Sequence, residues 1–200
     1  MKTHAVDQNT DEWYACRLGR LTASKATTIR ANGKGLETYC MELSLERITG
    51  RSQDTFEGTV HTRRGHELED LAVTVYEMEY EDTRPVGFVE LDEWVGCSPD
   101  RLVGEKGLLE VKCPSDKVMF EYVLGVKDPI KKYQDQCQMQ MYVSGREWCD
   151  LFLFNEQLGV QRHRIERDEK HIEKIKKGIE TAKKLIQDLC KKFMQGKEKK

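Results

Sequence analysis

The spacing of hydrophobic residues changes along the chain, and each change marks a change in predicted secondary structure. Hydrophobic residues recur at helical spacing near both ends, whereas short apolar runs typical of strands lie in the middle. The predicted helices span residues 22–31, 36–49, 63–80, 116–124, 131–143 and 168–194. The predicted strands span residues 86–91, 94–103, 108–113, 148–154 and 160–165.

Several helices carry their own boundary signals. Gly50 can end helix 36–49 in the left-handed conformation, and the side chain of Asp168 can cap the last helix. The face of helix 63–80 that we predict to be buried consists of Leu68, Leu71, Ala72, Val75 and Met78.

The order of these elements predicts an α/β or α+β domain with a central mixed sheet flanked by helices. A chain of 200 residues is long enough for one domain with a substantial core. We therefore expect residues 1–200 to form a single domain. Its core would cover about 13–165, followed by the long C-terminal helix at about 168–194.

Composition excludes several classes of protein. With 38% hydrophobic and 34% charged residues, the chain has the profile of a folded protein rather than a disordered one. It contains no run of ~18 apolar residues, so no membrane span is expected. Residues 1–13 lack the apolar core of a signal peptide, and we expect the protein in the cytosol. The seven cysteines form no Cys-x-x-Cys pair, which favours reduced thiols over a zinc or iron–sulfur site.

Charge is unevenly distributed although the formal net charge is only −2. Residues 170–200 contain eleven lysines and four acidic residues. Such a tail is typical of a solvated helix face, which we slightly favour, but it is also compatible with direct contact to phosphates. Composition therefore leaves nucleic acid open as a partner.

The candidate chemistry lies in the middle of the chain, where Asp100 is followed nine residues later by Glu110-Val111-Lys112. Side chains alternate between the faces of a strand, so Glu110 and Lys112 are expected on the same face. A hairpin turn between Asp100 and Glu110 can bring the two carboxylates together.

Two carboxylates and the backbone carbonyl of Val111 form a set of hard oxygen ligands that suits Mg²⁺, with Mn²⁺ as a possible substitute. Lys112 could orient the attacking water, assist its deprotonation or stabilise the charge that develops on a phosphate. The alternative is that Asp100 is an ordinary turn residue and that Glu110 and Lys112 lie on a solvated strand face. The apolar character of strand 108–113 and the abrupt stop at Pro114 count toward the metal site, but the spacing alone leaves both interpretations open.

Several segments together resemble the lambda-type phage alkaline exonucleases, the viral recombinase branch of the PD-(D/E)xK nucleases. The segments are 13–24 (WYACRLGRLTAS), 64–72 (RGHELEDLA), 97–100 (CSPD), 109–114 (LEVKCP) and 133–140 (YQDQCQMQ). They follow the order of the family's motifs and cover most of residues 13–165. The resemblance implies a restriction-endonuclease-like fold.

The resemblance also assigns roles to individual residues. It implies that Asp100 and Glu110 bind metal with the Val111 carbonyl, that Lys112 is the catalytic lysine and that Glu69 supports a metal directly or through water. The assignment of Gln136, near the reacting water or phosphate, could shift to Gln134 or Gln138. From the residues alone, Glu69 and Gln136 would be taken as ordinary polar positions on helices.

A phosphate pocket is implied as well. Arg17 matches the arginine that binds a terminal 5′-phosphate, with Ser24 and Ser98 as hydroxyl partners, and arginine suits this role through its paired N–H donors. The alternatives are a surface arginine and a serine that caps a helix. His66 has no partner at ligand spacing and is interpreted as a surface residue of its helix.

The expected activity is digestion of one strand of a linear duplex in the 5′ to 3′ direction, which releases 5′-mononucleotides and leaves a 3′ single strand. The resemblance further implies a ring-shaped homotrimer, a single-strand annealing protein as partner and a bacterial or prophage-encoded origin. Two features depart from the family: Arg64 stands where a large aromatic is expected, and the tail is richer in lysine. A PD-(D/E)xK endonuclease and a non-catalytic DNA-binding scaffold remain the alternatives.

Overall fold

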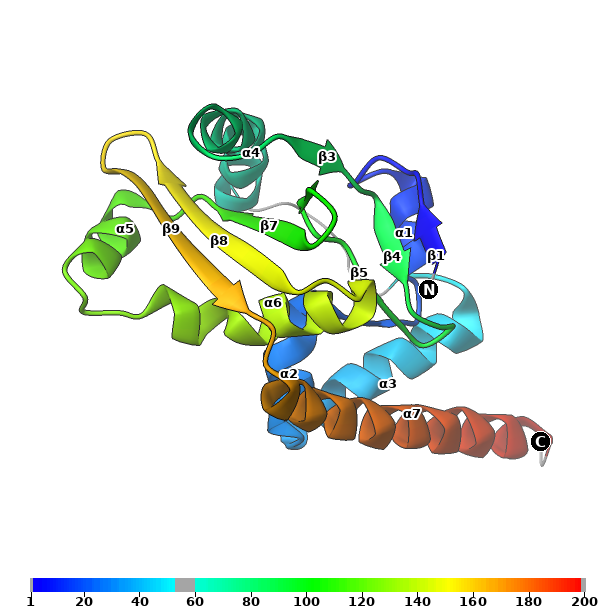
Figure 1. The fold of residues 1–200 in the computed structure, drawn as a ribbon. Coiled ribbons are helices and arrows are strands. Elements are labelled where there is room, and N and C mark those ends of the chain that lie inside the picture. The colour runs from blue at the N-terminus through cyan, green and yellow to red at the C-terminus, as the bar shows by residue number, and fades with distance from the viewer. Residues whose placement is uncertain (1, 53–59, 199–200) are drawn as a thin grey trace.

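Helices flank two β-sheets in the computed structural model, which describes residues 2–52 and 60–198 (Figure 1). For residues 60–67 and for residue 198 the description is limited to the backbone. The helices are α1 (Asp11–Arg17), η1 (Ala23–Lys25, a 3₁₀ turn), α2 (Ala26–Ala31), α3 (Lys34–Thr49), α4 (Val60–Glu79), α5 (Asp116–Val123), α6 (Pro129–Ser144) and α7 (Glu169–Glu198).

The strands divide between a four-stranded and a five-stranded sheet, and both are mixed. The first sheet has the order β1 (Lys2–His4), β4 (Phe88–Glu90), β5 (Val95–Cys97) and β2 (Leu21–Thr22). The second has the order β3 (Thr83–Pro85), β6 (Arg101–Val103), β7 (Gly107–Lys112), β8 (Trp148–Asn155) and β9 (Gly159–Glu166). The predicted class of mixed sheet flanked by helices is confirmed, with two sheets in place of one.

Pro99 separates the two sheets directly before Asp100. The sequence predicted one strand over residues 94–103, but β5 ends at Cys97 and β6 begins at Arg101 in the other sheet. Proline has no N–H to donate to a strand ladder, so pairing stops there. The break leaves Asp100 at the edge of the five-stranded sheet, directly before β6.

Most predicted helices are present with small shifts. Gly50 ends α3 in the left-handed conformation with φ 65°, and the Asp168 carboxylate accepts the backbone N–H groups of Lys170 and His171 at the start of α7. Helix 22–31 is divided into η1 and α2. The short elements β1, α1, β2 and β3 had no counterpart in the predicted helices and strands.

The predicted buried face of α4 is wrong in part. Leu68 and Ala72 are buried as expected, but Leu71 is 46% and Met78 82% exposed. The helix instead buries Tyr76, whose hydroxyl donates to the buried carboxylate of Asp150 in β8 at 2.7 Å. The buried face of α4 therefore includes the polar contact of Tyr76 with Asp150 and excludes Leu71 and Met78.

Helices cover β7 and β8 from both sides. Leu109 and Val111 of β7 belong to the hydrophobic cluster beneath α4, whereas Leu108 belongs to the cluster beneath α5 and α6. Figure 1 shows α4 above this sheet and α6 below it. Because side chains alternate along a strand, Glu110 and Lys112 share the face of Leu108 and point toward α6. Among the described residues, no helix has the length and hydropathy of a membrane span.

Gly178 of α7 controls how closely α7 approaches α2, which follows directly on the turn that carries Ser24. A Cβ at Gly178 would lie 2.0 Å from the backbone carbonyl oxygen of Ile29, so the two helices would have to separate. We expect Gly178→Ala to lower the free energy of unfolding by about 1–3 kcal/mol, as overpacking does. Urea denaturation measures this change.

Gly196, in the same helix, provides the matched control, because a Cβ there would meet nothing within 4 Å. Gly196→Ala should leave the stability unchanged or raise it by up to about 1 kcal/mol through helix propensity. Equal effects of the two substitutions would show that helix propensity, and not the close approach to Ile29, determines the result.

Candidate active site

The structure brings every site residue predicted from the sequence to the wall of one pocket of about 360 Å³. These residues are Arg17, Ser24, Glu69, Ser98, Asp100, Glu110, Val111, Lys112 and Gln136. The pocket is also lined by Gln8, Asn9, Trp13 and Cys113, to which the sequence analysis gave no role.

The β6–β7 hairpin sets the two carboxylates beside each other. The strands pair antiparallel with Arg101 opposite Leu109, so Asp100 lies next to Glu110 in the same register. The backbone N–H of Val111 donates to Asp100 Oδ2 at 2.6 Å and fixes that carboxylate against β7. The hairpin therefore produces the geometry that the spacing predicted.

Glu110 is the most deeply buried acid of the pocket, with 1% of its surface exposed. Its Oε1 accepts hydrogen bonds from Lys112 Nζ and Gln136 Nε2, and its Oε2 accepts one from Gln140 Nε2 at 2.6 Å. A buried carboxylate needs such donors because it has lost its water. The amide donors both come from α6.

Gln136 is the glutamine that reaches the site, as the resemblance implied. The alternative Gln138 has a different contact: its side chain bonds the carbonyl of Glu166 at 2.7 Å and the N–H of Asp168 at 2.9 Å, where β9 passes into α7. Gln134 does not line the pocket. The sequence analysis missed Gln140, although it stands four residues after Gln136 and therefore on the same face of the helix.

The surroundings of Asp100 and Lys112 shift the pKa of each group away from its ordinary value. Removal from water and the neighbouring carboxylate of Glu110 raise the pKa of Asp100 well above its ordinary value, against the lowering influence of Lys112. Burial would lower the pKa of Lys112, but the carboxylates of Glu110 and Asp100 outweigh it and raise the pKa. Lys112 is therefore an ammonium at neutral pH.

The donor set fits a hard divalent cation. Two adjacent carboxylates repel each other, and a cation between them would relieve the repulsion that raises the pKa of Asp100. Among the described residues, no three His, Cys, Asp or Glu side chains converge to form a metal cluster. A cation would thus rely on two carboxylates, the Val111 carbonyl and water, as Mg²⁺ commonly does. Glu69 lines the pocket and raises the pKa of Asp100, which suits support through water.

Arg17, Ser24 and Ser98 form a second group of side chains in the same pocket, the Arg17 cluster. Arg17 Nη1 donates to Ser98 Oγ at 3.4 Å, and Nη2 donates to Ser24 Oγ at 3.3 Å. The guanidinium lies 4.3 Å from the ring centroid of Trp13, whose Nε1 also donates to Ser98 Oγ at 2.9 Å. A planar guanidinium with two hydroxyls beside it is suited to bind a phosphate. Trp13 opened the recognised motif, but nothing in the sequence indicated its contact with Arg17.

Other sequence-based interpretations have mixed outcomes. All seven cysteines lie among the described residues, and none of them forms a disulfide there. The side chains of Arg64 and His66 lie outside the described residues. In the lysine-rich helix, Lys176 pairs with Glu173 and Lys183 with Asp92, so part of its charge is neutralised within the protein.

Comparison with known proteins identifies relatives. The family model of the YqaJ-like viral recombinase domain matches residues 12–147. The alkaline exonuclease LHK-Exo from Laribacter hongkongensis has a similar crystal structure, with a TM-score of 0.87 and 31% identity over 95% of this chain and 99% of that chain. Its complex with dAMP gives a TM-score of 0.87, 30% identity and the same coverage. The predicted PD-(D/E)xK fold is therefore confirmed.

A phage related exonuclease from Haemophilus somnus 129PT has a TM-score of 0.72 at 18% identity, over 87% of this chain and 96% of that chain. At this identity the similarity shows the fold alone. No curated protein sequence matches the chain.

The raised pKa of Asp100 predicts a pH-dependent loss of stability without metal. The folded protein holds the Asp100 proton more tightly than the unfolded chain, so stability falls as pH rises from the ordinary value of 3.8 through the folded pKa. Asp100→Asn keeps an acceptor for the Val111 N–H but carries no charge. In EDTA, the melting temperature of Asp100→Asn minus that of the wild type should grow as pH rises. A constant difference would show that the charge is not destabilising.

Proposed function

The chain belongs to the family of YqaJ-like viral recombinase domains, and from that premise we propose that it is a Mg²⁺-dependent 5′ to 3′ exodeoxyribonuclease acting on the ends of double-stranded DNA. Family membership supports a nuclease. The single observation that carries the finer proposal is that one pocket contains both the Asp100–Glu110–Lys112 set and the Arg17–Ser24–Ser98 cluster.

Asp100, Glu110 and the Val111 carbonyl would hold the cation. When bound, Mg²⁺ would supply a water of lowered pKa and neutralise charge on the scissile phosphate, and Mn²⁺ would suit the same ligands. Asp100 is held in position by the Val111 N–H at 2.6 Å. Glu110 is held by donors from β7 and α6, so its carboxylate cannot rotate freely.

Lys112 stabilises the negative charge that accumulates on the phosphate as the P–O bond breaks. Its raised pKa keeps it protonated at neutral pH, which suits charge stabilisation better than proton abstraction. Gln136 lines the pocket beside Lys112 and places an amide near the reacting water or phosphate.

Arg17 would select DNA ends. A terminal phosphate carries more negative charge and more acceptor oxygens than an internal phosphodiester, and the guanidinium with Ser24 and Ser98 presents several donors to it. Binding of the 5′-phosphate there would place the following phosphodiester at the acidic pair. The products would be 5′-mononucleotides and a 3′ single strand, available to an annealing protein for homologous recombination.

The proposal includes a ring-shaped homotrimer and the annealing protein as partners. Apolar side chains are exposed on α5, in the loop that follows it and at the start of α6: Phe120, Val123, Leu124, Val126 and Ile130. Several exposed large apolar side chains within one short stretch are typical of protein contacts, and they support the presence of a partner or a second copy.

Three DNA substrates test the activity: a linear duplex with 5′-phosphates, the same duplex with 5′-hydroxyls, and a covalently closed circle. With Mg²⁺ the phosphorylated duplex should be shortened from its 5′ ends and the circle should survive, whereas EDTA should stop cleavage. Cleavage of the circle would indicate an endonuclease. A complete lack of cleavage would favour a DNA-binding scaffold.

In the same assay, Lys112→Ala should lower the rate at least about a hundredfold while DNA binding persists. The matched control is Lys106→Ala, on the turn of the same hairpin, where the lysine is exposed and pairs with Glu147. Its rate should equal that of the wild type.

Arg17→Ala should harm the cleavage of 5′-phosphorylated ends much more than that of 5′-hydroxyl ends. Loss of a charge-assisted contact to phosphate corresponds to about a tenfold or larger effect. Arg84→Ala, which changes an exposed arginine of β3, serves as the control. Equal losses on both kinds of end would rule out the phosphate role of Arg17.

A further inference from the structure

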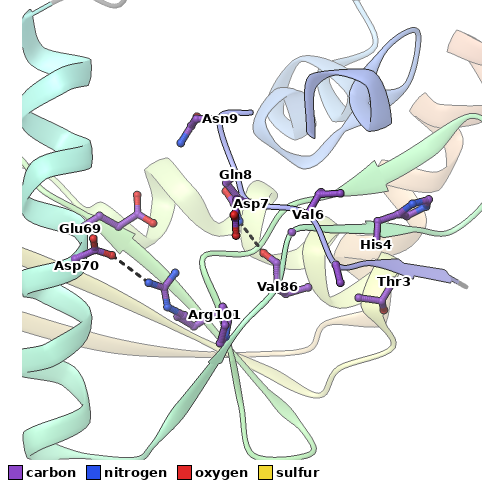
Figure 2. Close-up of a pocket in the computed structure, with 13 residues that line it drawn as sticks. Thr3, His4, Val6, Asp7, Gln8, Asn9, Glu69, Asp70, Val86 and Arg101 are labelled. Atoms are coloured by element: carbon purple, nitrogen blue, oxygen red, sulfur yellow. Dashed lines mark hydrogen bonds and ion pairs between the residues drawn. The ribbon is translucent and has the colours of Figure 1, made fainter. Parts of the chain in front are cut away.

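A second hollow adjoins the active-site pocket. It has a volume of about 650 Å³ and lies between α4 and the N-terminal segment of residues 3–9 (Figure 2). Gln8, Asn9 and Glu69 line both spaces and therefore mark the boundary between them. The Gln8 side chain donates to the carbonyls of Val86 and Pro99 at 3.0 and 2.9 Å. These bonds hold the N-terminal segment against the residue that precedes Asp100.

Arg101 is the arginine that lines this hollow. It follows Asp100 directly, and because side chains alternate along an extended chain, the two residues face opposite directions. Asp100 lines the active-site pocket and Arg101 lines the hollow. Arg101 Nη1 donates to the backbone carbonyl of Asp100 at 2.8 Å, so the guanidinium is anchored to the backbone of a predicted metal ligand.

The partner of Arg101 is an exposed acid that another anion can replace. Arg101 Nη2 donates to Asp70 Oδ1 at 3.3 Å, and the Asp70 side chain is 89% exposed. Ion pairs with an exposed carboxylate contribute little because water screens them. Figure 2 shows the guanidinium directed toward Asp70. A guanidinium has five N–H donors, so these two contacts leave donors for a phosphate.

The two spaces adjoin, so a DNA strand that leaves the active-site pocket would enter the hollow. Arg17 and the Asp100–Glu110 pair line the pocket, and Arg101 lines the hollow. In the proposed function Arg17 takes the 5′-phosphate and the acidic pair takes the scissile phosphate. The next phosphate of the same strand would then reach Arg101.

We propose that the hollow is a substrate subsite, in which Arg101 binds the phosphate on the 3′ side of the cleaved bond and the space beside it accommodates the attached nucleoside. This subsite rests on the proposed exonuclease function. It would hold the strand on both sides of the scissile bond, which restrains the reacting phosphodiester in its productive geometry.

The test is a pairwise comparison of charge removal on the DNA and on the protein. A 5′-phosphorylated duplex receives one neutral methylphosphonate at the first linkage beyond the cleaved bond, and the single-turnover rate of the first cleavage is measured. For the wild type, this change should slow cleavage about tenfold, as expected for loss of a hydrogen bond to a charged group. Arg101→Ala should lower the cleavage rate of the natural duplex by a similar factor. In this variant the methylphosphonate should cause no further loss of rate.

Three controls separate this contact from general effects. Arg101→Lys keeps a charge and should recover part of the rate. Arg84→Ala removes an exposed arginine from the neighbouring strand, where Arg84 is paired with Leu102, and should retain full sensitivity to the methylphosphonate. A methylphosphonate placed several linkages further along should have the same effect on the wild type and on Arg101→Ala.

The outcomes are distinct. The subsite assignment is overturned if the losses of rate caused by Arg101→Ala and by the methylphosphonate multiply. It is also overturned if Arg101→Ala instead removes the sensitivity of the rate to a methylphosphonate in the complementary strand. If the wild type does not cut the natural duplex, the exonuclease proposal fails. The same pairwise comparison is then made on dissociation constants in EDTA, where an absence of coupling also overturns the subsite and coupling supports it as a DNA contact.

Discussion

Burial of the Glu110 carboxylate is the constraint on which the arrangement of the site depends. A charge removed from water must be compensated by cations or hydrogen-bond donors. Lys112 from the same strand and Gln136 and Gln140 from α6 provide these donors. The helix must therefore remain within hydrogen-bond distance of β7, and the hydrophobic cluster beneath α5 and α6 holds it there.

Asp150, on the face of the five-stranded sheet toward α4, shows how a buried carboxylate is compensated where it has only a structural role. Asp150 accepts two bonds from Arg164, at 2.8 and 2.9 Å, and one from Tyr76 at 2.7 Å. Its charge is matched by a guanidinium, and the network fastens α4 to β8 and β9. Glu110 instead has a second acid, Asp100, beside it. Like charges placed together against their electrostatic preference are typical of functional sites.

Sequence reasoning identified the parts of the fold whose signals are local. The β6–β7 hairpin, the ends of α3 and the start of α7 follow from turn residues, Gly50 and the Asp168 cap. The two-residue strand β2 carries too few residues for a periodic pattern. The buried face of α4 also lay beyond local signals, because it includes the contact of Tyr76 with a distant partner. Gln140 was missed although its four-residue spacing from Gln136 placed it on the same helix face; only its hydrogen bond to Glu110, thirty residues away, shows that the position belongs to the site.

The Pro99 break has a consequence for how relatives of this protein can vary in length. Asp100 and Arg101 face different spaces because they are consecutive residues of an extended segment, in which side chains alternate in direction. A residue inserted between Asp100 and Arg101 would turn the Asp100 side chain to the other face while Arg101 stays paired with Leu109, because a shift of one residue reverses the face of a side chain in a strand. The turn at 104–106 lies outside the pairing that sets this order, since Gly107 already pairs with Val103. Insertions and deletions during evolution should therefore accumulate in that turn and be absent from the segment before β6.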